Sequence, residues 1–271
     1  MPADLYVGKS MLHMYEEPCI SAEHGAGAIF FSGCNLRCVY CQNRKISLLS
    51  QGNRTSESEL EKIIFGLCEQ GAECIEFITP THYTDRLANL LYRIKPKLSV
   101  PVVWNSGGYE KVETLRALNE LVDIYLPDFK YFSSELSLRY SAAGNYPEVC
   151  ADAIKEMLRQ TGKPKYSQDG KKLAGGVIVR HLVLPGCRHD SINILRHLRS
   201  IVEPDDIILS LMSQYTPDFY MQNRECVRHK NLERKLGSFE YNSVLDEATR
   251  LGFSGYFQHR DSASAAFTPD F

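Results

Sequence analysis

The sequence predicts an α/β fold, because short apolar runs and helical patterns alternate about six times along its 271 residues. The apolar runs are continuous, as in parallel strands that are buried on both faces. Right-handed crossovers between such strands allow either an open doubly wound sheet or a barrel. Both architectures bind ligands at the carboxyl ends of the strands. Polar residues at those ends are therefore the candidates for a functional site.

Composition and charge narrow the class of protein. A formal net charge of −2 gives no electrostatic reason to expect binding to nucleic acid or to an anionic membrane. The segment MPADLYVGKS lacks an apolar signal region, and no apolar run reaches the ~20 residues of a membrane helix. Nine cysteines in such a chain favour thiols and metal ligation over disulfides. We expect a cytoplasmic protein.

The predicted strands begin after residue 24. Residues 1–24 show no clear regular element, so we expect an N-terminal extension followed by one core domain over residues 25–271. Within the extension, the string EEPCIS favours a surface segment. The predicted strands cover residues 25–31, 74–79, 100–105, 122–130, 177–186 and 206–212.

The predicted helices lie between these strands. The clearest one begins at Ser56, because Glu59 three residues later completes a capping box and leucine and isoleucine then follow at helical spacing. Residues 163–172 favour a solvated loop, and residues 214–236 a long, partly basic connection. The other predicted helices cover about residues 85–95, 110–121, 134–140, 147–160, 191–201 and 242–251.

A cysteine-rich loop directly follows the first predicted strand. The string GCNLRCVYCQN over residues 33–43 places Cys34, Cys38 and Cys41 in a C-x3-C-x2-C spacing. Three thiolates on a glycine-led loop can converge on one soft metal centre. A structural zinc site or an ordinary electron-transfer [4Fe–4S] cluster uses four ligands. Three cysteines therefore suggest a four-iron cluster in which one iron is open to an exchangeable ligand.

This C-x3-C-x-aromatic-C loop, followed by some six β/α units, resembles the radical S-adenosylmethionine superfamily. Within it, the chain is similar to the pyruvate formate-lyase activating enzymes and to an uncharacterised branch of activase-like proteins. The resemblance extends from about Glu16 to Phe271 and implies a single-domain, partial (βα)6 barrel of the TIM type. It is carried by the strings EEPCIS, FFSGCNLRCVYCQN, TPTHY, YLPDFKY, VRHLVLPG and SLMSQYTP.

The resemblance also implies a chemistry. Cys34, Cys38 and Cys41 would hold a [4Fe–4S] cluster, and the amino and carboxylate groups of S-adenosylmethionine would chelate its fourth iron. One electron from the reduced cluster would cleave the sulfonium and yield a 5′-deoxyadenosyl radical, which abstracts a hydrogen atom from the substrate. A flavodoxin or a ferredoxin would supply the electron. The cofactors carry this chemistry, and the protein positions them.

Charged residues at the later strand ends are candidates for holding the cofactor. Asp128 and Lys130 share one face of a strand, where they must pair or bind a ligand, because an unpaired buried charge is costly. Arg180 interrupts an apolar strand and suits a carboxylate or ribose oxygens, or else a buried salt bridge with Asp128. Matching family positions contact the cofactor. His181 lies on the opposite face and is expected outside the barrel.

Neutral residues complete the expected cofactor site, in part where the chain departs from the family pattern. Thr79 and Thr81 stand where many relatives have a Gly-Gly-Glu run that meets the methionine amino group, and Gln214 lies near the place of an adenosine-binding His. Asn105 replaces an Asp beside Ser106, which leaves a monovalent cation site in doubt. Tyr40 offers an aromatic face to the adenine or is a packing residue.

The remaining cysteines divide into two groups. Cys68, Cys74 and Cys150 fall in helix or strand patterns and are expected in the core. Cys19 and Cys187 fall in predicted loops and are candidates for a role near the substrate, and the role of Cys226 is open.

Three hypotheses for function follow. The first is an activase that abstracts a hydrogen atom from a glycine of a glycyl radical enzyme. The second keeps the radical chemistry but acts on a small molecule or a peptide. The third is a zinc or iron–sulfur module without catalysis. Substrate contacts lie on variable loops, so the sequence does not identify the substrate.

Overall fold

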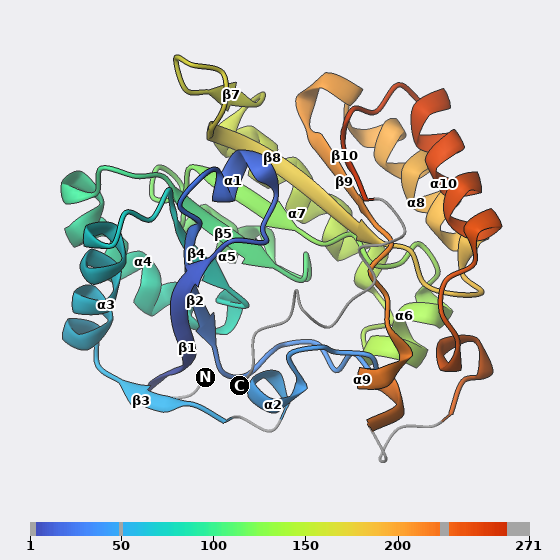
Figure 1. Cartoon of the computed structure of the whole chain (residues 1–271), viewed down its shortest axis with the longest axis horizontal. Coiled ribbons are helices and arrows are strands. Elements are labelled where there is room, and N and C mark those ends of the chain that lie inside the picture. The colour runs from blue at the N-terminus through green and yellow to red at the C-terminus, as the bar shows by residue number, and fades with distance from the viewer. Residues whose placement is uncertain (1–3, 49–50, 223–227, 259–271) are drawn as a thin grey trace.

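The computed structural model describes residues 4–48, 51–222 and 228–258, and its centre is one curved sheet (Figure 1). The sheet has ten strands in the described part of the chain, in the order β10-β9-β8-β6-β5-β4-β2-β1-β3, with β7 paired to β8. The strands are β1 Leu5–His13, β2 Ala26–Phe31, β3 Asn53–Thr55, β4 Ile75–Ile78, β5 Val102–Ser106, β6 Ile124–Pro127, β7 Lys165–Tyr166, β8 Leu173–Leu182, β9 Ile208–Met212 and β10 Gly255–Phe257.

Helices connect most of these strands. Short 3-10 turns are η1 Thr81–Tyr83, η2 Lys95–Lys97, η3 Pro204–Asp206 and η4 Lys230–Glu233. The α-helices are α1 Pro18–Ser21, α2 Arg44–Ser47, α3 Glu57–Glu69, α4 Thr84–Ile94, α5 Val112–Arg116, α6 Ser134–Ser141, α7 Tyr146–Thr161, α8 Arg188–Ile201, α9 Pro217–Gln222 and α10 Ser238–Arg250.

The strand directions confirm the predicted α/β fold. From β2 through β4, β5, β6, β8 and β9 to β10, each neighbouring pair is parallel. The antiparallel pairs within the described residues are β1 with β2, β1 with β3, and β7 with β8. Because β10 and β3 are the two ends of the strand order and do not pair with each other there, the sheet is a partial barrel and not a closed one.

The first strand is a correction to the sequence analysis. Residues 1–24 were expected to hold no regular element, yet β1 is nine residues long and lies between β2 and β3. Its apolar side chains alternate only weakly, with Leu5 and Val7 buried. Backbone pairing with two neighbours, which a hydrophobic pattern does not reveal, accounts for the strand.

The EEPCIS segment is a second correction, because it is buried and does not lie on the surface. It contains α1, whose Cys19 and Ile20 are each 3% exposed. These two side chains pack against strand residues such as Val103 and Ile178, which face the interior of the barrel. The short helix therefore covers the amino end of the barrel, and the segment is part of the buried core.

The lengths of several elements also differ from prediction. The capping box at Ser56 is present and α3 begins as expected, but α5 ends at Arg116, well before residue 121. Residues 124–127 alone form β6, where a strand over 122–130 was expected. The long connection over 214–236 contains α9 and η4, and β10 was not predicted.

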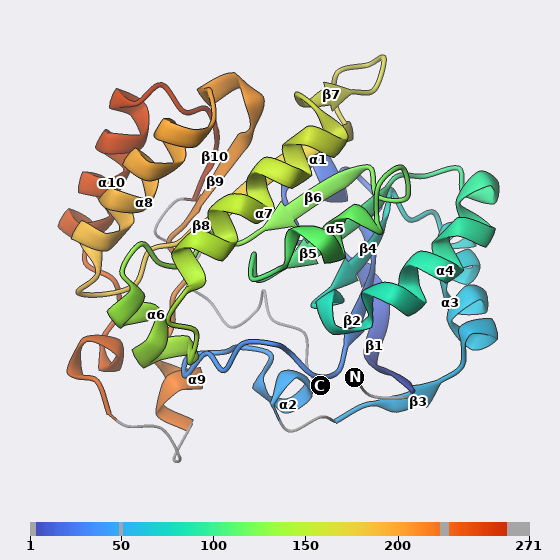
Figure 2. The same cartoon turned by 180° about the vertical axis from the view of Figure 1, so that it is seen from behind.

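The strands separate two packing environments. Ile75 and Phe77 of β4 pack into the large outer core with helix residues such as Leu60 and Leu87. The strand alternation therefore turns Glu76 toward the inside of the barrel. Figure 2 shows α4, α5 and α7 crossing the outer face of the sheet.

The two ends of the barrel are occupied by different segments. The cysteine loop and α2 follow β2 at the carboxyl end of the parallel strands, whereas α1 lies at the amino end (Figure 1). Any site at the carboxyl end is therefore built from the cysteine loop and the later strand ends. None of the described helices has the length and apolar character needed to cross a membrane.

The buried position of β1 leads to a stability prediction. Leu5→Ala removes a side chain that is 0% exposed, and we expect it to lower the free energy of unfolding by about 2–5 kcal/mol. Urea denaturation followed by circular dichroism measures the change. Ser10→Ala, at an exposed position of the same strand, should change stability by no more than about 0.5 kcal/mol. Equal stability of the wild-type and Leu5→Ala proteins would contradict the position of β1.

Candidate iron–sulfur and cofactor site

A cavity of about 320 Å³ lies at the carboxyl end of the barrel and extends into its interior. The three cysteines of the loop and polar residues from several strand ends line it together. Of the site residues predicted from sequence, all but Thr81 line this cavity: Cys34, Cys38, Tyr40, Cys41, Thr79, Asn105, Ser106, Asp128, Lys130, Arg180 and Gln214.

The sulfur atom of each loop cysteine has its own hydrogen-bond partner. The backbone N–H of Leu36 donates to Cys34 Sγ at 3.4 Å, and the hydroxyl of Ser141 donates to Cys38 Sγ at 3.0 Å. Cys41 Sγ lies 3.2 Å from Ser47 Oγ. Donors of this kind stabilise thiolates and adjust the reduction potential of a metal centre bound to them.

Burial makes two of these cysteines, Cys34 and Cys41, poor thiolates when no metal is bound to them. Burial raises the pKa of Cys34 to about 12, and the neighbouring Cys38 and Cys41 add to the shift. Burial also raises the pKa of Cys41. A bound metal centre supplies the positive charge that three adjacent thiolates need.

The three loop cysteines line one cavity, and each sulfur has a different polar partner. In an iron–sulfur cluster each cysteine binds a different iron, so the sulfurs need not converge on one point. The donor set, three cysteine sulfurs with one polar partner each, therefore fits a [4Fe–4S] cluster.

A chain of hydroxyl groups leads from the cavity wall to Cys38. Tyr40 Oη lies 2.6 Å from Tyr131 Oη, which lies 2.7 Å from Ser141 Oγ. Because Ser141 donates to Cys38, a consistent direction has Tyr40 donating to Tyr131 and Tyr131 to Ser141. Tyr40 thus supports the environment of a sulfur atom while its ring lines the cavity.

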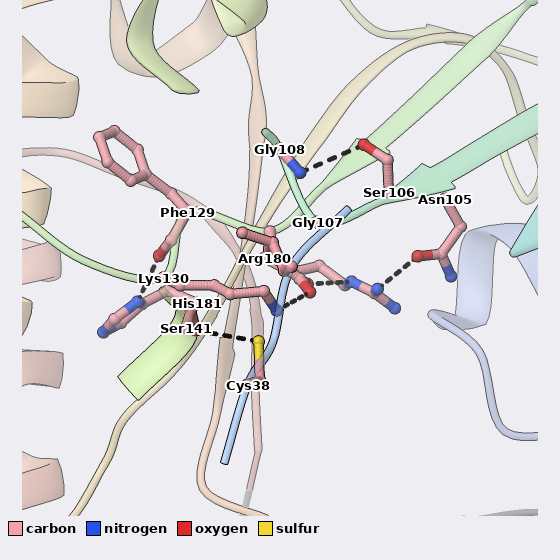
Figure 3. A network of polar contacts seen from close by, with 12 residues as sticks. Cys38, Asn105, Ser106, Gly107, Gly108, Phe129, Lys130, Ser141, Arg180 and His181 are labelled. Atoms are coloured by element: carbon pink, nitrogen blue, oxygen red, sulfur yellow. Dashed lines mark hydrogen bonds and ion pairs between the residues drawn. The ribbon is translucent and has the colours of Figure 1, made fainter. Parts of the chain in front are cut away.

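Arg180 connects three segments in the barrel interior (Figure 3). Its guanidinium donates to Asp128 Oδ1 at 3.0 Å and to Asn105 Oδ1 at 2.6 Å. A third contact, of 3.4 Å, reaches Glu16 Oε2. The salt bridge with Asp128, one of the two alternatives left by the sequence, is therefore present, and the same side chain also lines the cavity.

Asp128 also pairs with Lys130, whose Nζ lies 2.5 Å from Asp128 Oδ2. Burial alone would raise the pKa of Asp128, but Lys130 and Arg180 together lower it below its usual range. Burial alone would lower the pKa of Lys130, but the Asp128 carboxylate and the Cys38 sulfur raise it. Both groups are therefore charged at neutral pH, and the ammonium lies on the cysteine side of the network (Figure 3).

The turn after β5 supports this network. Ser106 Oγ donates to Glu110 Oε2 at 2.5 Å and accepts from the Gly108 N–H at 3.3 Å. Gly108 has φ +71°, and a Cβ there would lie 2.3 Å from the carbonyl oxygen of Asp128. Only glycine fits so close to this backbone, which fixes the turn beside Asp128.

The two threonines after β4 lie in different places. Thr79 lines the cavity and has φ +59°, an uncommon backbone angle for a β-branched residue that costs about 1–3 kcal/mol. Thr81 belongs to η1, and its hydroxyl donates to Glu110 Oε1 at 3.0 Å. Thr81 thus does not line the cavity, but it shares the Glu110 carboxylate with Ser106.

Gln214 and His181 are also held by neighbours. Gln214 Oε1 accepts from Gln258 Nε2 at 3.2 Å, so the segment after β10 joins the cavity wall. His181 Nδ1 lies 2.7 Å from the carbonyl oxygen of Phe129, on the side away from Arg180 (Figure 3). Burial lowers the pKa of His181 to about 4, so its ring is neutral at physiological pH.

The sequence analysis missed acidic residues at the inner end of the cavity. Glu16 and Glu17 line it, and Glu76 lies behind them with Oε1 accepting from Asn105 Nδ2 at 2.7 Å. A charged residue within an apolar strand identified Arg180, and the same signal is present for Glu76 in CIEFIT. No such signal exists for Glu16 and Glu17, because they precede a helix of only four residues.

Most of the other cysteines in the described part of the chain are buried. Cys19 and Cys187 were expected in loops, but Cys19 belongs to α1 and Cys187 immediately precedes α8, and both are buried. Cys74 and Cys150 are buried as predicted, whereas Cys68 is only partly buried and packs against the edge of the core. Cys226 lies outside the described residues.

Comparison with known proteins identifies the class to which this fold and cavity belong. Residues 24–143 match the family described as a 4Fe-4S single cluster domain. An uncharacterised protein of Methanocaldococcus jannaschii is 30% identical over 260 residues, which are 90% of this chain and 67% of the relative. The chain belongs to the radical S-adenosylmethionine superfamily, with a [4Fe–4S] cluster and S-adenosylmethionine as its cofactors.

Solved structures share the partial-barrel fold at low sequence identity. A domain of a pyruvate formate-lyase-activating enzyme from Bacteroides vulgatus superposes with a TM-score of 0.50 at 12% identity, over 69% of this chain and 100% of that domain. Streptococcus suis SuiB bound to S-adenosylmethionine gives 0.55 at 13%, over 85% of this chain and half of SuiB. A spore photoproduct lyase variant with bound AdoMet gives 0.57 at 11%, over 88% of this chain and 78% of the lyase.

The hydroxyl chain leads to a spectroscopic prediction. Ser141→Ala removes the donor to Cys38 Sγ, and we expect a lower reduction potential of the cluster, because that donor stabilises the more negative, reduced state. A redox titration monitored by EPR measures the shift. Ser134→Ala, at an exposed position of the same helix, should leave the potential unchanged. A potential that stays the same, or rises, in Ser141→Ala would contradict this role.

Proposed function

We propose that this protein uses its cluster and S-adenosylmethionine to abstract a hydrogen atom from a substrate that binds in the cavity, with Cys34, Cys38 and Cys41 as the cluster ligands. The single observation that carries the proposal is the shared cavity, which joins the three cysteines to a buried network of charged side chains. When bound, the cluster supplies an electron for cleavage of the sulfonium, and the cleaved cofactor supplies the hydrogen-abstracting group.

The charged network has distinct tasks in this proposal. Lys130, beside the cysteines, holds the carboxylate of S-adenosylmethionine, because its ammonium is cationic and has donors besides the one to Asp128. Asp128 fixes both Lys130 and Arg180 in position. Thr79, Asn105, Ser106 and Gln214 supply neutral polar contacts from the cavity wall.

A small polar substrate, either a metabolite or a peptide side chain, is the candidate that the geometry supports best. The inner end of the cavity is lined by buried carboxyl groups, which a deeply inserted polar group would meet. A backbone glycine has no charge with which to use them. The acidic inner end therefore favours the second of the three hypotheses.

Activation of a glycyl radical enzyme is the other candidate. The sheet is open between β10 and β3, and an open edge gives a partner's loop a lateral approach. The fold likeness to a domain of a pyruvate formate-lyase-activating enzyme points in the same direction. In either case a flavodoxin or a ferredoxin would supply the electron.

The ligand assignment is tested by substitution. Cys38→Ala should abolish both the visible absorbance of the cluster and reductive formation of 5′-deoxyadenosine, since two cysteines do not retain the cluster. Cys68→Ser, on α3 and remote from the cavity, should retain both. Wild-type absorbance or cleavage in Cys38→Ala would exclude the assignment, and one zinc per chain without iron or sulfide would favour the non-catalytic module.

Isotope transfer separates the two substrate classes. With reductant and deuterated candidate metabolites or peptides, we expect deuterium in 5′-deoxyadenosine, measured by mass spectrometry. A glycyl EPR doublet produced on a co-encoded glycyl radical enzyme, without transfer from any small molecule, would instead establish the activase.

A further inference from the structure

The inner end of the cavity carries three carboxyl groups that the proposed cofactor site does not use. Glu16 and Glu17 line the cavity just before α1, and Glu76 of β4 lies next to them. We call these three residues the carboxylate floor. The pKa of Glu16 is raised by burial and then by Glu76, which shows that the groups are close enough to interact.

The carboxylate floor is buried and incompletely partnered. Glu17 is 8% exposed and Glu76 is 0% exposed. Within the described part of the chain, Oε2 of Glu17 and Oε2 of Glu76 have no hydrogen-bond donor. A buried carboxylate oxygen without a donor loses its hydration and gains nothing in return, so a ligand that donates to these atoms would stabilise them. Glu17 presents such an atom at the cavity itself.

The charges around the floor do not balance. Four carboxyl groups, those of the floor and of Asp128, surround two cationic side chains, Arg180 and Lys130. Arg180 is shared among Asp128, Asn105 and Glu16, and Lys130 points to the cysteines. His13 lies 3.7 Å from Glu16, but burial and Arg180 lower its pKa. Full ionisation would leave two negative charges in excess, four minus two.

The floor lies at the opposite end of the cavity from the cysteines. Glu76 is two residues before Ile78, the last residue of β4, and Glu16 and Glu17 approach from the amino end of the barrel. Arg180 and Asp128 lie between the floor and Lys130. A group bound at the floor is therefore separated from the cluster side by the charged network, where we place the cofactor.

The excess charge calls for a cation, and the geometry favours an organic one. The two oxygens without donors belong to side chains on different segments, Glu17 before α1 and Glu76 on β4. An alkylammonium has three donors on a compact charge and can satisfy separate carboxylate oxygens. We propose that the carboxylate floor binds a protonated primary amine of the substrate; this rests on the proposed hydrogen-abstraction function.

The competing explanation is that the carboxyl groups of the floor retain protons, which removes the excess negative charge without a ligand. Glu16, whose pKa is raised by burial, would then keep its proton and the floor would need no ligand. In our proposal this state is the empty one, and an arriving ammonium replaces the proton. A second source of an ammonium is S-adenosylmethionine itself. Binding measurements distinguish these cases.

The first experiment uses n-butylamine, the side chain of lysine without its backbone, as the probe. Isothermal titration calorimetry on the cluster-loaded protein at pH 8 should show binding of n-butylamine and none of 1-butanol. Glu17→Gln keeps the shape and removes the charge, and it should weaken n-butylamine binding about tenfold or more. Glu23→Gln, at an exposed position after α1, should bind like the wild type.

S-adenosylmethionine is titrated in parallel. Its affinity should be equal in the wild type and Glu17→Gln, because the floor serves the substrate. Loss of S-adenosylmethionine affinity in Glu17→Gln with unchanged n-butylamine binding would assign the floor to the cofactor and overturn the proposal. Absence of n-butylamine binding to the wild type would also overturn it and favour a floor that retains its protons.

A pH series on the wild type keeps the test valid if the variant does not fold. Burial raises the pKa of Glu76 to about 7, whereas an alkylamine stays protonated from pH 6 to 8. Ionised carboxylates bind the ammonium, so affinity should fall about tenfold from pH 8 to pH 6. A pH-independent affinity would overturn the proposal.

Other titratable and charged groups lie around Glu76 and Arg180. They are His13, Glu16, Glu17, Cys74 and Asp128.

Failure of this inference is distinguishable from failure of the proposed function. Reductive formation of 5′-deoxyadenosine without any binding of n-butylamine would contradict the proposed amine site and still support the radical chemistry. Binding of n-butylamine by a protein that never cleaves S-adenosylmethionine would support the amine site and contradict the proposed radical chemistry.

Discussion

The interior of this barrel depends on one buried guanidinium. Arg180 joins Asp128 of the strand end beside it, Asn105 of β5 and Glu16 of the N-terminal segment. An arginine inside a sheet is tolerable only when its donors are satisfied by charged or polar acceptors, because its charge cannot be removed by deprotonation. The positions of these three partners, and through Asp128 that of Lys130, therefore follow from Arg180.

This constraint divides the cavity into two electrostatic halves. On one side, three cysteine sulfurs lie near the Lys130 ammonium, and each sulfur has a polar partner. On the other side, carboxyl groups outnumber the available cations. A cofactor with a carboxylate and a substrate with an amine would each find a complementary half, and both would lie within one barrel.

Much of this arrangement could be predicted from the sequence, and the limits have physical causes. The parallel strands were visible as continuous apolar runs, and polar residues interrupting or following them pointed to Asp128, Lys130 and Arg180. Strand β1 was missed because pairing on both edges stabilises a sequence with weak alternation. Glu16 and Glu17 were missed because their burial depends on the tertiary position of α1. Thr81 was placed in the cofactor site by position alone, whereas its hydroxyl turns to Glu110.

The contact between Arg180 and Glu16 joins residues that are 164 positions apart in the chain. The three cysteines, in contrast, lie within one short loop after β2. Contacts of long sequence separation form late in folding, because the chain must first close a large loop. The cysteine loop can thus gather its ligands well before β8 brings Arg180 to the N-terminal segment. The order of folding would then place cluster insertion ahead of completion of the pocket beneath it.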